Sequence, residues 1–336
     1  MQKTDKFLIV SAPVANLRAK PVDAKPLYIH DDLQQTQVLY NEKLLYLDET
    51  EDWYYAEAVE QQKYTSKNIW QGYSGWIRKH SVSFACEPLK YNVIVKNKTA
   101  RILKDLSGKK GSLLKVLMGT KLPVHETANE KYYSVILADS REGYVSKDKV
   151  NRIETNPVEP MIRRKIIKTG RLFLGTPYLW GGRSLYTPEF LKVSYQSNNK
   201  KQRNVDSIFR RSRHLMLPPV LTGVDCSGLV NLVYLINNIK IPRDAREQWM
   251  RARKIDGKFL KPGDLIFVSM EERPDIISHV MLNIDGERFI EALETGGTVR
   301  INNFTEKFGV SFLKFAERNF IACNRHIRFG SFIKSQ

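Results

Sequence analysis

The chain has 336 residues, of which 42% are hydrophobic, and this is enough material for two or three globular domains. Fifty-four lysines and arginines against 36 aspartates and glutamates give a formal net charge of +18, a balance that favours an anionic partner. The basic residues are spread along the whole chain without an RNA-binding aromatic signature or zinc-finger spacing. We therefore interpret the charge first as a solvated surface and expect no nucleic-acid partner.

The cysteines and the N-terminal residues bear on the compartment. Three widely spaced cysteines, Cys86, Cys226 and Cys323, argue against a disulfide framework and fit a reducing environment. The apolar run at residues 7–10 is too short for the core of a signal peptide. No segment approaches the roughly 18 apolar residues that a membrane-spanning helix needs. These features predict a cytoplasmic protein, and export to the cell envelope through an unrecognised signal is the alternative.

The first 155 residues read as two small β-barrels in tandem. Between residues 6 and 83, short β-rich runs at 7–10, 38–46, 53–59 and 75–78 alternate with turn residues. A similar pattern recurs between residues 98 and 145. We place the two domains at residues 1–85 and 86–155, and their strand phrases resemble those of bacterial SH3 modules. The aromatic residues Trp53, Trp76 and Tyr144 are expected to pack within them.

A third domain is predicted at residues 156–336. A proline-punctuated linker at 156–160 opens it, and apolar residues at near-helical spacing predict a helix over 161–174. The motif GTPYLWGG follows at 175–182. We expect Trp180 to pack under this loop, whereas Tyr178 fits either packing or a place beside a functional cleft.

A basic segment at about 184–222 follows this motif. It contains Lys200, Lys201, Arg203, Arg210, Arg211 and Arg213 and few acidic residues. A long loop without a pattern in a compact domain is usually either functional or disordered. The segment is therefore interpreted as a surface loop, or as a lid or docking surface for an anionic partner.

The motif GVDCSGLV at 223–230 places Cys226 at the start of an apolar helical run. Asp225 and Ser227 supply side chains that can cap the helix. Unpaired backbone N–H groups and the helix dipole stabilise an anion at this position, so we expect a lowered pKa for the thiol. A single cysteine is more often a small buried hydrophobe, so the interpretation depends on the residues that accompany it.

Those residues follow downstream. IPRD at 241–244 precedes a second predicted helix that Asp244 could cap, and PGDLIF at 262–267 and SHV at 278–280 begin strands. Strands predicted at 264–268, 279–284, 288–293, 298–301 and 320–326 indicate an antiparallel sheet. Because helices precede the strands, the third domain is predicted to be α+β.

The motifs GTPYLWGG, DCSGLV, IPRD, PGDLIF and SHV, in this order, resemble those of the NlpC/P60 family of cysteine peptidases, which cut peptides of the bacterial cell wall. The resemblance covers about residues 160–327 and implies a papain-like domain with Cys226 as nucleophile and His279 as base. It also places Tyr178, Asp225, Ser227 and Ser278 near the substrate.

The third catalytic position departs from the family. Where relatives often have histidine, this chain has Glu291, which lies 12 residues after His279 (291 − 279). Its carboxylate could accept the imidazole N–H and stabilise the imidazolium. The alternative is a strand glutamate that faces outward.

The resemblance implies peptidoglycan stem peptides or muropeptides as partners, and the bond between γ-D-glutamate and diaminopimelate or lysine as the target. In relatives with SH3 modules the aspartate of IPRD helps to bind the free amine of a terminal L-alanine. We expect Asp244 to do so here together with Tyr73 from the first barrel, for which rim packing is the alternative.

No cofactor or metal is expected, because the cysteines and histidines lack ligand spacing and no phosphate-binding loop motif is present. The alternative function is a non-catalytic binding protein for cell-wall fragments or another anionic polymer. In that case Cys226 would be incidental.

Overall fold

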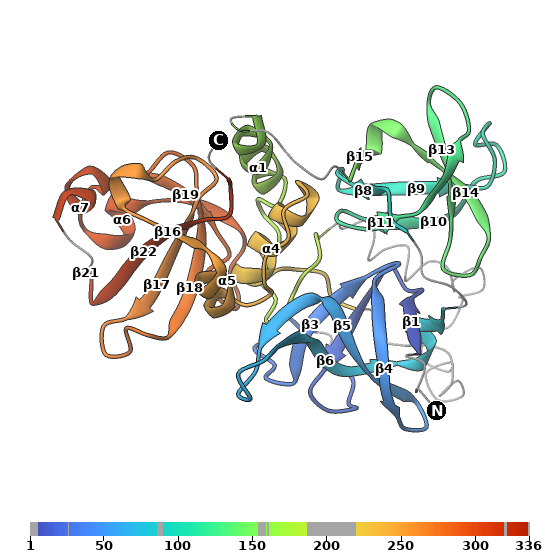
Figure 1. Cartoon of the computed structure of the whole chain (residues 1–336), viewed down its shortest axis with the longest axis horizontal. Coiled ribbons are helices and arrows are strands. Elements are labelled where there is room, and N and C mark those ends of the chain that lie inside the picture. The colour runs from blue at the N-terminus through green and yellow to red at the C-terminus, as the bar shows by residue number, and fades with distance from the viewer. Residues whose placement is uncertain are drawn as a thin grey trace, which may run out of the picture.

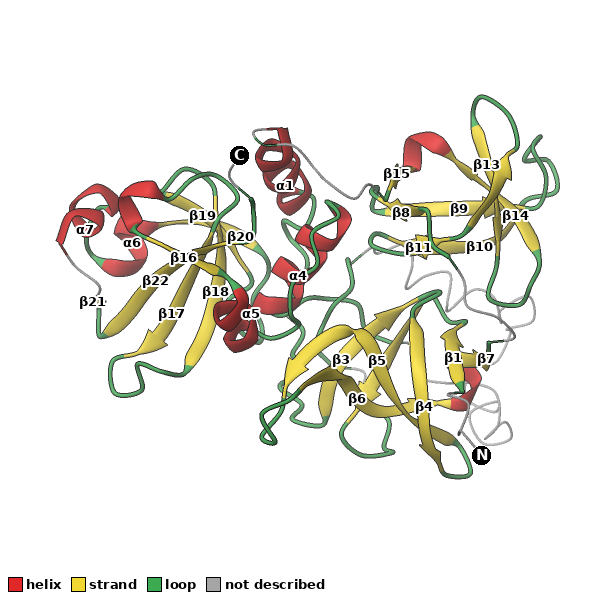
Figure 2. Ribbon diagram, viewed as in Figure 1, coloured by secondary structure: helices red, strands yellow, loops and turns green. Residues whose placement is uncertain are grey.

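The computed structural model describes residues 6–25, 27–85, 90–153, 159, 161–186, 220–318 and 321–334 (Figure 1). Two domains built mainly of strands are followed by a domain of helices and strands (Figure 2). We call them the first β-domain (6–85), the second β-domain (90–153) and the C-terminal domain (161–334). Most of the predicted basic segment, including all six of its named lysines and arginines, and Cys86 lie outside the described residues. No helix in the described ranges is long and apolar enough to cross a membrane.

The first β-domain is built on one antiparallel sheet of order β3-β2-β6-β5-β4-β1-β7. Its strands are β1 (Phe7–Val10), β2 (Val14–Arg18), β3 (Gln34–Leu39), β4 (Lys43–Glu49), β5 (Trp53–Tyr64), β6 (Trp70–Arg78) and β7 (Val82–Phe84). Alternate residues such as Leu17, Val38 and Leu44 point into one apolar core. The single strand predicted over 38–46 is wrong, because the chain turns at residues 40–42, where Asn41 has a φ of 67°.

The second β-domain contains two smaller sheets. Their orders are β10-β9-β14-β13-β12 and β11-β8-β15. The strands are β8 (Val93–Val95), β9 (Thr99–Leu103), β10 (Ser112–Leu117), β11 (Lys121–Leu122), β12 (Val124–Thr127), β13 (Tyr132–Ile136), β14 (Glu142–Ser146) and β15 (Val150–Arg152). Short 3-10 helices lie at Lys79–Ser81 in the first β-domain and at Lys147–Lys149 here.

The C-terminal domain is α+β, as predicted, and its sheet has the order β16-β22-β17-β18-β19-β20. The strands are β16 (Arg253–Ile255), β17 (Leu265–Met270), β18 (Ile277–Asn283), β19 (Arg288–Glu291), β20 (Arg300–Asn303), β21 (Ile321–Ala322), which pairs with β22, and β22 (Arg325–Ser331). The helices are α1 (Met161–Arg171), α4 (Cys226–Ile236), α5 (Ala245–Arg251), the 3-10 helix Gly257–Phe259, α6 (Phe304–Phe308) and α7 (Phe312–Arg318). α4 and α5 lie between this sheet and the first β-domain (Figure 1).

One apolar core joins the three domains. It contains the buried side chains of α4 together with Val14 and Leu39 of the first β-domain and Ile94 of the second. At the turn before β11, Gly119 has a φ of 90°, and an added Cβ there would lie 2.9 Å from Leu232 of α4. This close approach and positive φ favour glycine. The shared core fixes the β-domains against the helix that carries Cys226.

Candidate active site

Cys226 is the first residue of α4, and the side chain of Asp225 caps this helix. Asp225 Oδ1 accepts a hydrogen bond from the Gly228 amide at 2.6 Å and another from Ser227 Oγ at 3.1 Å. The backbone N–H groups of Ser227 and Val280 both donate to the thiol of Cys226. Because Val280 follows His279 on β18, the thiol lies directly beside the strand that carries the histidine.

The expected lowering of the thiol pKa is not what the structure shows. Part of the Cys226 side chain is accessible, yet burial raises its pKa to about 12, and the neighbouring carboxylate of Asp225 raises it further. The two backbone N–H donors and the charge of Arg243 act in the opposite direction but do not outweigh burial. The resting Cys226 side chain is therefore a neutral thiol, which needs a base to take its proton before it can react.

His279 and Glu291 form a buried pair on adjacent strands. The Nε2 atom of His279 lies 2.8 Å from Glu291 Oε2, and the glutamate side chain is fully buried. Lys307 Nζ donates to the same oxygen at 2.5 Å, and Asn302 Nδ2 donates to Oε1. Burial acts to raise the pKa of Glu291, but His279 and Lys307 outweigh it and lower the pKa to about 2. Glu291 is thus an inward-facing carboxylate that stays ionised.

This pair determines which nitrogen of His279 can act as a base. An ionised carboxylate only accepts hydrogen bonds, so the Nε2 atom facing Glu291 must carry a proton. In the neutral ring Nδ1 is then the unprotonated nitrogen. His279 can therefore accept a proton at Nδ1 while Glu291 stabilises the resulting imidazolium.

A cavity of about 390 Å³ opens at the thiol, and it brings together the residues that the sequence singled out. Its walls include Cys226, His279, Tyr73, Tyr178, Asp225, Ser227, Asp244 and Ser278. Glu291 is behind His279 and does not line the cavity. Asp225 and Ser227 use their side-chain oxygens within the protein, and Ser278 Oγ donates to Val268 O at 3.3 Å. Burial raises the pKa of Tyr178 above its usual value, with a further contribution from Cys226, so its hydroxyl remains a donor.

Tyr73 and Asp244 meet across the domain boundary. Tyr73 Oη donates to Asp244 Oδ2 at 3.0 Å, and both side chains face the cavity. Burial raises the pKa of Asp244, although Arg243 lowers it in part. Asp244 stands at the N-cap position of α5 without making a side-chain cap, so the capping alternative does not hold. The carboxylate of Asp244 thus lines the cavity, with Tyr73 on one oxygen and Arg243 Nη1 3.7 Å from the other.

Sequence reasoning missed several contributors. Trp180 does not pack under its loop: it is 38% exposed and lines the cavity. Lys307 and Asn302 reach Glu291 from outside any motif, and only the fold brings them there. Arg243, in the motif IPRD, is fully buried against Asp225. The position of Arg243 in a predicted loop could have suggested that it forms an ion pair. The sequence does not indicate that its partner is Asp225.

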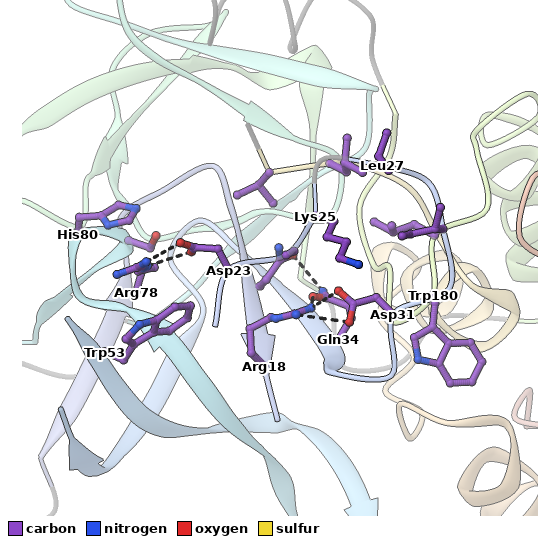
Figure 3. Close-up of a pocket in the computed structure, with 17 residues that line it drawn as sticks. Arg18, Asp23, Lys25, Leu27, Asp31, Gln34, Trp53, Arg78, His80 and Trp180 are labelled. Atoms are coloured by element: carbon purple, nitrogen blue, oxygen red, sulfur yellow. Dashed lines mark hydrogen bonds and ion pairs between the residues drawn. The ribbon is translucent and has the colours of Figure 1, made fainter. Parts of the chain in front are cut away.

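A second, smaller cavity of about 70 Å³ lies between the first β-domain and residues 179–180 and 220–221 of the C-terminal domain (Figure 3). It shares Gln34 and Trp180 with the cavity at the thiol. Two ion pairs lie among its lining residues, Arg18 with Asp31 at 2.7 Å and Arg78 with Asp23 at 2.5 Å (Figure 3). It contains no pairing of a nucleophile with a base, so we assign the chemistry to the cavity at Cys226. Within the described ranges, no three His, Cys, Asp or Glu side chains are grouped as metal ligands.

Comparisons with known proteins agree with this geometry. Residues 175–316 match the model of the NlpC/P60 family. The chain is 29% identical over 280 residues to the gamma-D-glutamyl-L-lysine dipeptidyl-peptidase of Bacillus subtilis, an alignment that covers 82% of this chain and 78% of that protein. It is 23% identical over 311 residues to dipeptidyl-peptidase 6 of Lysinibacillus sphaericus, over 89% and 92% of the two chains. The crystal structure of an NlpC/P60 family protein from Bacillus cereus aligns with a TM-score of 0.66 at 22% identity, over 88% and 94% of the chains, which shows the fold.

Proposed function

We propose, from the match of residues 175–316 to the NlpC/P60 family model and the similarity to a gamma-D-glutamyl-L-lysine dipeptidyl-peptidase, that this chain is a cysteine peptidase that hydrolyses bacterial cell-wall peptides at the bond between γ-D-glutamate and a diamino acid. One observation carries the proposal. A thiol at a helix N-terminus and a histidine paired with a buried carboxylate face the same cavity. A binding protein with an incidental cysteine would not need this arrangement.

In the first half of the reaction Cys226 attacks the γ-carbonyl carbon of D-glutamate. Because the resting thiol is neutral, its proton passes to Nδ1 of His279 as the carbon–sulfur bond forms. Glu291 stabilises the imidazolium. The hydroxyl of Tyr178, held protonated, is a donor available to the negative charge that develops on the carbonyl oxygen.

In the second half the imidazolium gives its proton to the amine of the diamino acid, which leaves, and a thioester remains on Cys226. A water molecule then attacks the thioester as His279 accepts one of its protons. The carbon–sulfur bond breaks, and the returned proton restores the thiol. His279 thus serves first as base and then as acid, both when the thioester forms and when water hydrolyses it.

Substrate choice is proposed from Asp244 and Tyr73, which line the same cavity as the thiol. The carboxylate of Asp244, with the hydroxyl of Tyr73 beside it, offers a place for the free ammonium of an N-terminal L-alanine. An acetylated amine loses this charge, and the carboxylate would then face a neutral group in a partly desolvated site. Two relatives are named dipeptidyl-peptidases, which agrees with release of an N-terminal dipeptide.

The test uses two cysteine variants. Cys226→Ala should abolish cleavage of L-Ala-γ-D-Glu-diaminopimelate, while Cys323→Ala, which alters an exposed cysteine elsewhere, should retain it. If Cys226→Ala cleaves the peptide at the wild-type rate, the proposed role of Cys226 is wrong, and the non-catalytic binding protein remains as the alternative. A parallel comparison of free and N-acetylated peptide should show a large preference for the free amine that Asp244→Ala removes. Equal rates on both peptides would remove the amine-recognition role.

A further inference from the structure

Arg243 connects the first β-domain to the start of the helix that carries the nucleophile. Its side chain is fully buried. Nη1 and Nη2 donate to the two carboxylate oxygens of Asp225 at 3.1 and 2.8 Å, and Nη1 also donates to Ser227 Oγ at 2.9 Å. Nε donates to Thr36 Oγ1 of β3, in the other domain, at 2.8 Å. One guanidinium thus holds both the cap of α4 and a hydroxyl of the first β-domain.

The contacts of Thr36 continue into a closed ring of buried polar groups that crosses the domain boundary twice. In order from Arg243 the ring passes through Thr36, Gln61, Glu42, Arg183 and Asn231. Asn231 Nδ2 then donates to the carbonyl oxygens of residues 241 and 242, immediately before Arg243. The six side chains have exposed fractions of 5% or less.

A ring of this kind specifies geometry more than it adds stability. Desolvation largely offsets the attraction of a buried ion pair such as Arg183 with Glu42. Removal of any one of these side chains would, however, leave its buried neighbours in the ring without a hydrogen-bond partner. The favourable state is therefore the one in which the first β-domain is seated in a single register against residues 241–243.

We propose that Arg243 is a positioning residue through which the seated first β-domain sets the orientation and local charge of the α4 N-terminus, and so the reactivity of Cys226. The proposal rests on the proposed role of Cys226 as the nucleophile. It extends the function of the first β-domain from forming a wall of the cavity to holding the nucleophile helix.

The electrostatics at the thiol agree with this role. Burial is the main cause of the raised pKa of Cys226, and the charge of Asp225 raises it further. The positive charge of Arg243 lowers the thiol pKa, and the guanidinium also pairs with the carboxylate of Asp225 next to the thiol. An arginine that is less firmly held would compensate Asp225 less well.

Thr36→Val is the informative substitution, because Thr36 does not line the cavity and the change removes the hydroxyl while keeping the shape. We expect the rate at which iodoacetamide alkylates Cys226 between pH 7 and 9 to fall about tenfold. For the peptide substrate, we expect kcat to fall about tenfold with little change in KM. Alkylation of exposed Cys323, followed by mass spectrometry in the same samples, provides the internal reference.

Two matched variants separate the hydroxyl from general destabilisation. Thr36→Ser restores the hydroxyl and should return the alkylation rate of Cys226 to that of the wild type. Thr120→Val removes another buried hydroxyl, one with no hydrogen-bond partner among the described residues, in the second β-domain. It should leave the rate unchanged.

A wild-type alkylation profile in folded Thr36→Val would overturn the proposal, as would an equal loss in Thr36→Val and Thr36→Ser. If Thr36→Val does not fold, Arg243→Lys decides, because lysine keeps the charge but cannot hold Thr36 and Asp225 together. Its alkylation rate should fall about tenfold, and a wild-type rate would refute the proposal. The alkylation rate is measured without a peptide substrate. Its result therefore does not depend on whether the proposed substrate is correct.

Discussion

Replacing Glu291 by glutamine should reduce both the stability of the fold and the rate of turnover. The carboxylate is fully buried and accepts hydrogen bonds from His279, Lys307 and Asn302. A glutamine side chain keeps the shape but has one acceptor oxygen and no charge. It would leave the ammonium of Lys307, which is 20% exposed, without its counter-charge.

The magnitude follows from the pKa of Glu291. These partners lower it from 4.5 to about 2 against the effect of burial. That difference corresponds to about 3 kcal/mol of stability at about 1.36 kcal/mol per pH unit. Because the pKa is lower in the folded state, this contribution is complete above pH 4.5 and is lost as the pH falls from 4.5 to about 2.

Turnover should fall as well, because the imidazolium of His279 forms during the reaction. A hydrogen bond to a charged group contributes about 1.5–3 kcal/mol, which corresponds to a loss of roughly tenfold to a hundredfold in kcat. We expect this loss at pH 7 with KM nearly unchanged.

The assay is urea unfolding of wild type and Glu291→Gln at pH 7 and at pH 3, together with kcat at pH 7. The stability difference should be about 3 kcal/mol at pH 7 and smaller at pH 3. Glu294→Gln, an exposed glutamate three residues further on, is the matched control and should change neither quantity. A stability difference that does not depend on pH, or an unchanged kcat, would refute the assigned role of Glu291.

Three further substitutions test separate parts of the site. Tyr73→Phe removes the donor to Asp244 and should raise KM about tenfold for a peptide with a free amine but not for its N-acetylated form; equal effects on both would argue for packing alone. Trp180→Ala should raise KM with a loss of stability under about 1 kcal/mol, because the ring is exposed at the cavity; a large drop in the unfolding midpoint would show instead that it packs. Gly228→Ala should destabilise the fold by about 3 kcal/mol, since its Cβ would overlap the Gly182 carbonyl oxygen, and a wild-type midpoint would contradict that steric argument.

Cys226 and His279 could be named from the sequence because each belongs to a short motif that resembles those of a known family, and Glu291 because it occupies the third place, 12 residues after His279. Cys226 begins α4, His279 is near the start of β18 and Glu291 ends β19. The periodicity of the apolar residues placed these elements to within a few positions. The fold class followed from the order of helices and strands.

Interactions between residues far apart in the sequence could not be predicted from it. The thiol pKa was expected to fall because the helix terminus is a local feature, whereas burial and the opposing charge of Asp225 depend on the tertiary structure. Lys307 reaches Glu291 from α6, and no pattern in the sequence links the two. The turn at Asn41 was missed because the apolar residues on either side read as one continuous strand.

The most direct test of the proposed function is to digest L-Ala-γ-D-Glu-diaminopimelyl-D-Ala in ¹⁸O-labelled water and identify the products by mass spectrometry. Hydrolysis through Cys226 at the γ-glutamyl bond predicts an L-Ala-D-Glu dipeptide with one ¹⁸O atom in its γ-carboxylate, and no such product from Cys226→Ala. Cleavage only between diaminopimelate and D-Ala, or a labelled dipeptide formed equally by Cys226→Ala, would contradict the account.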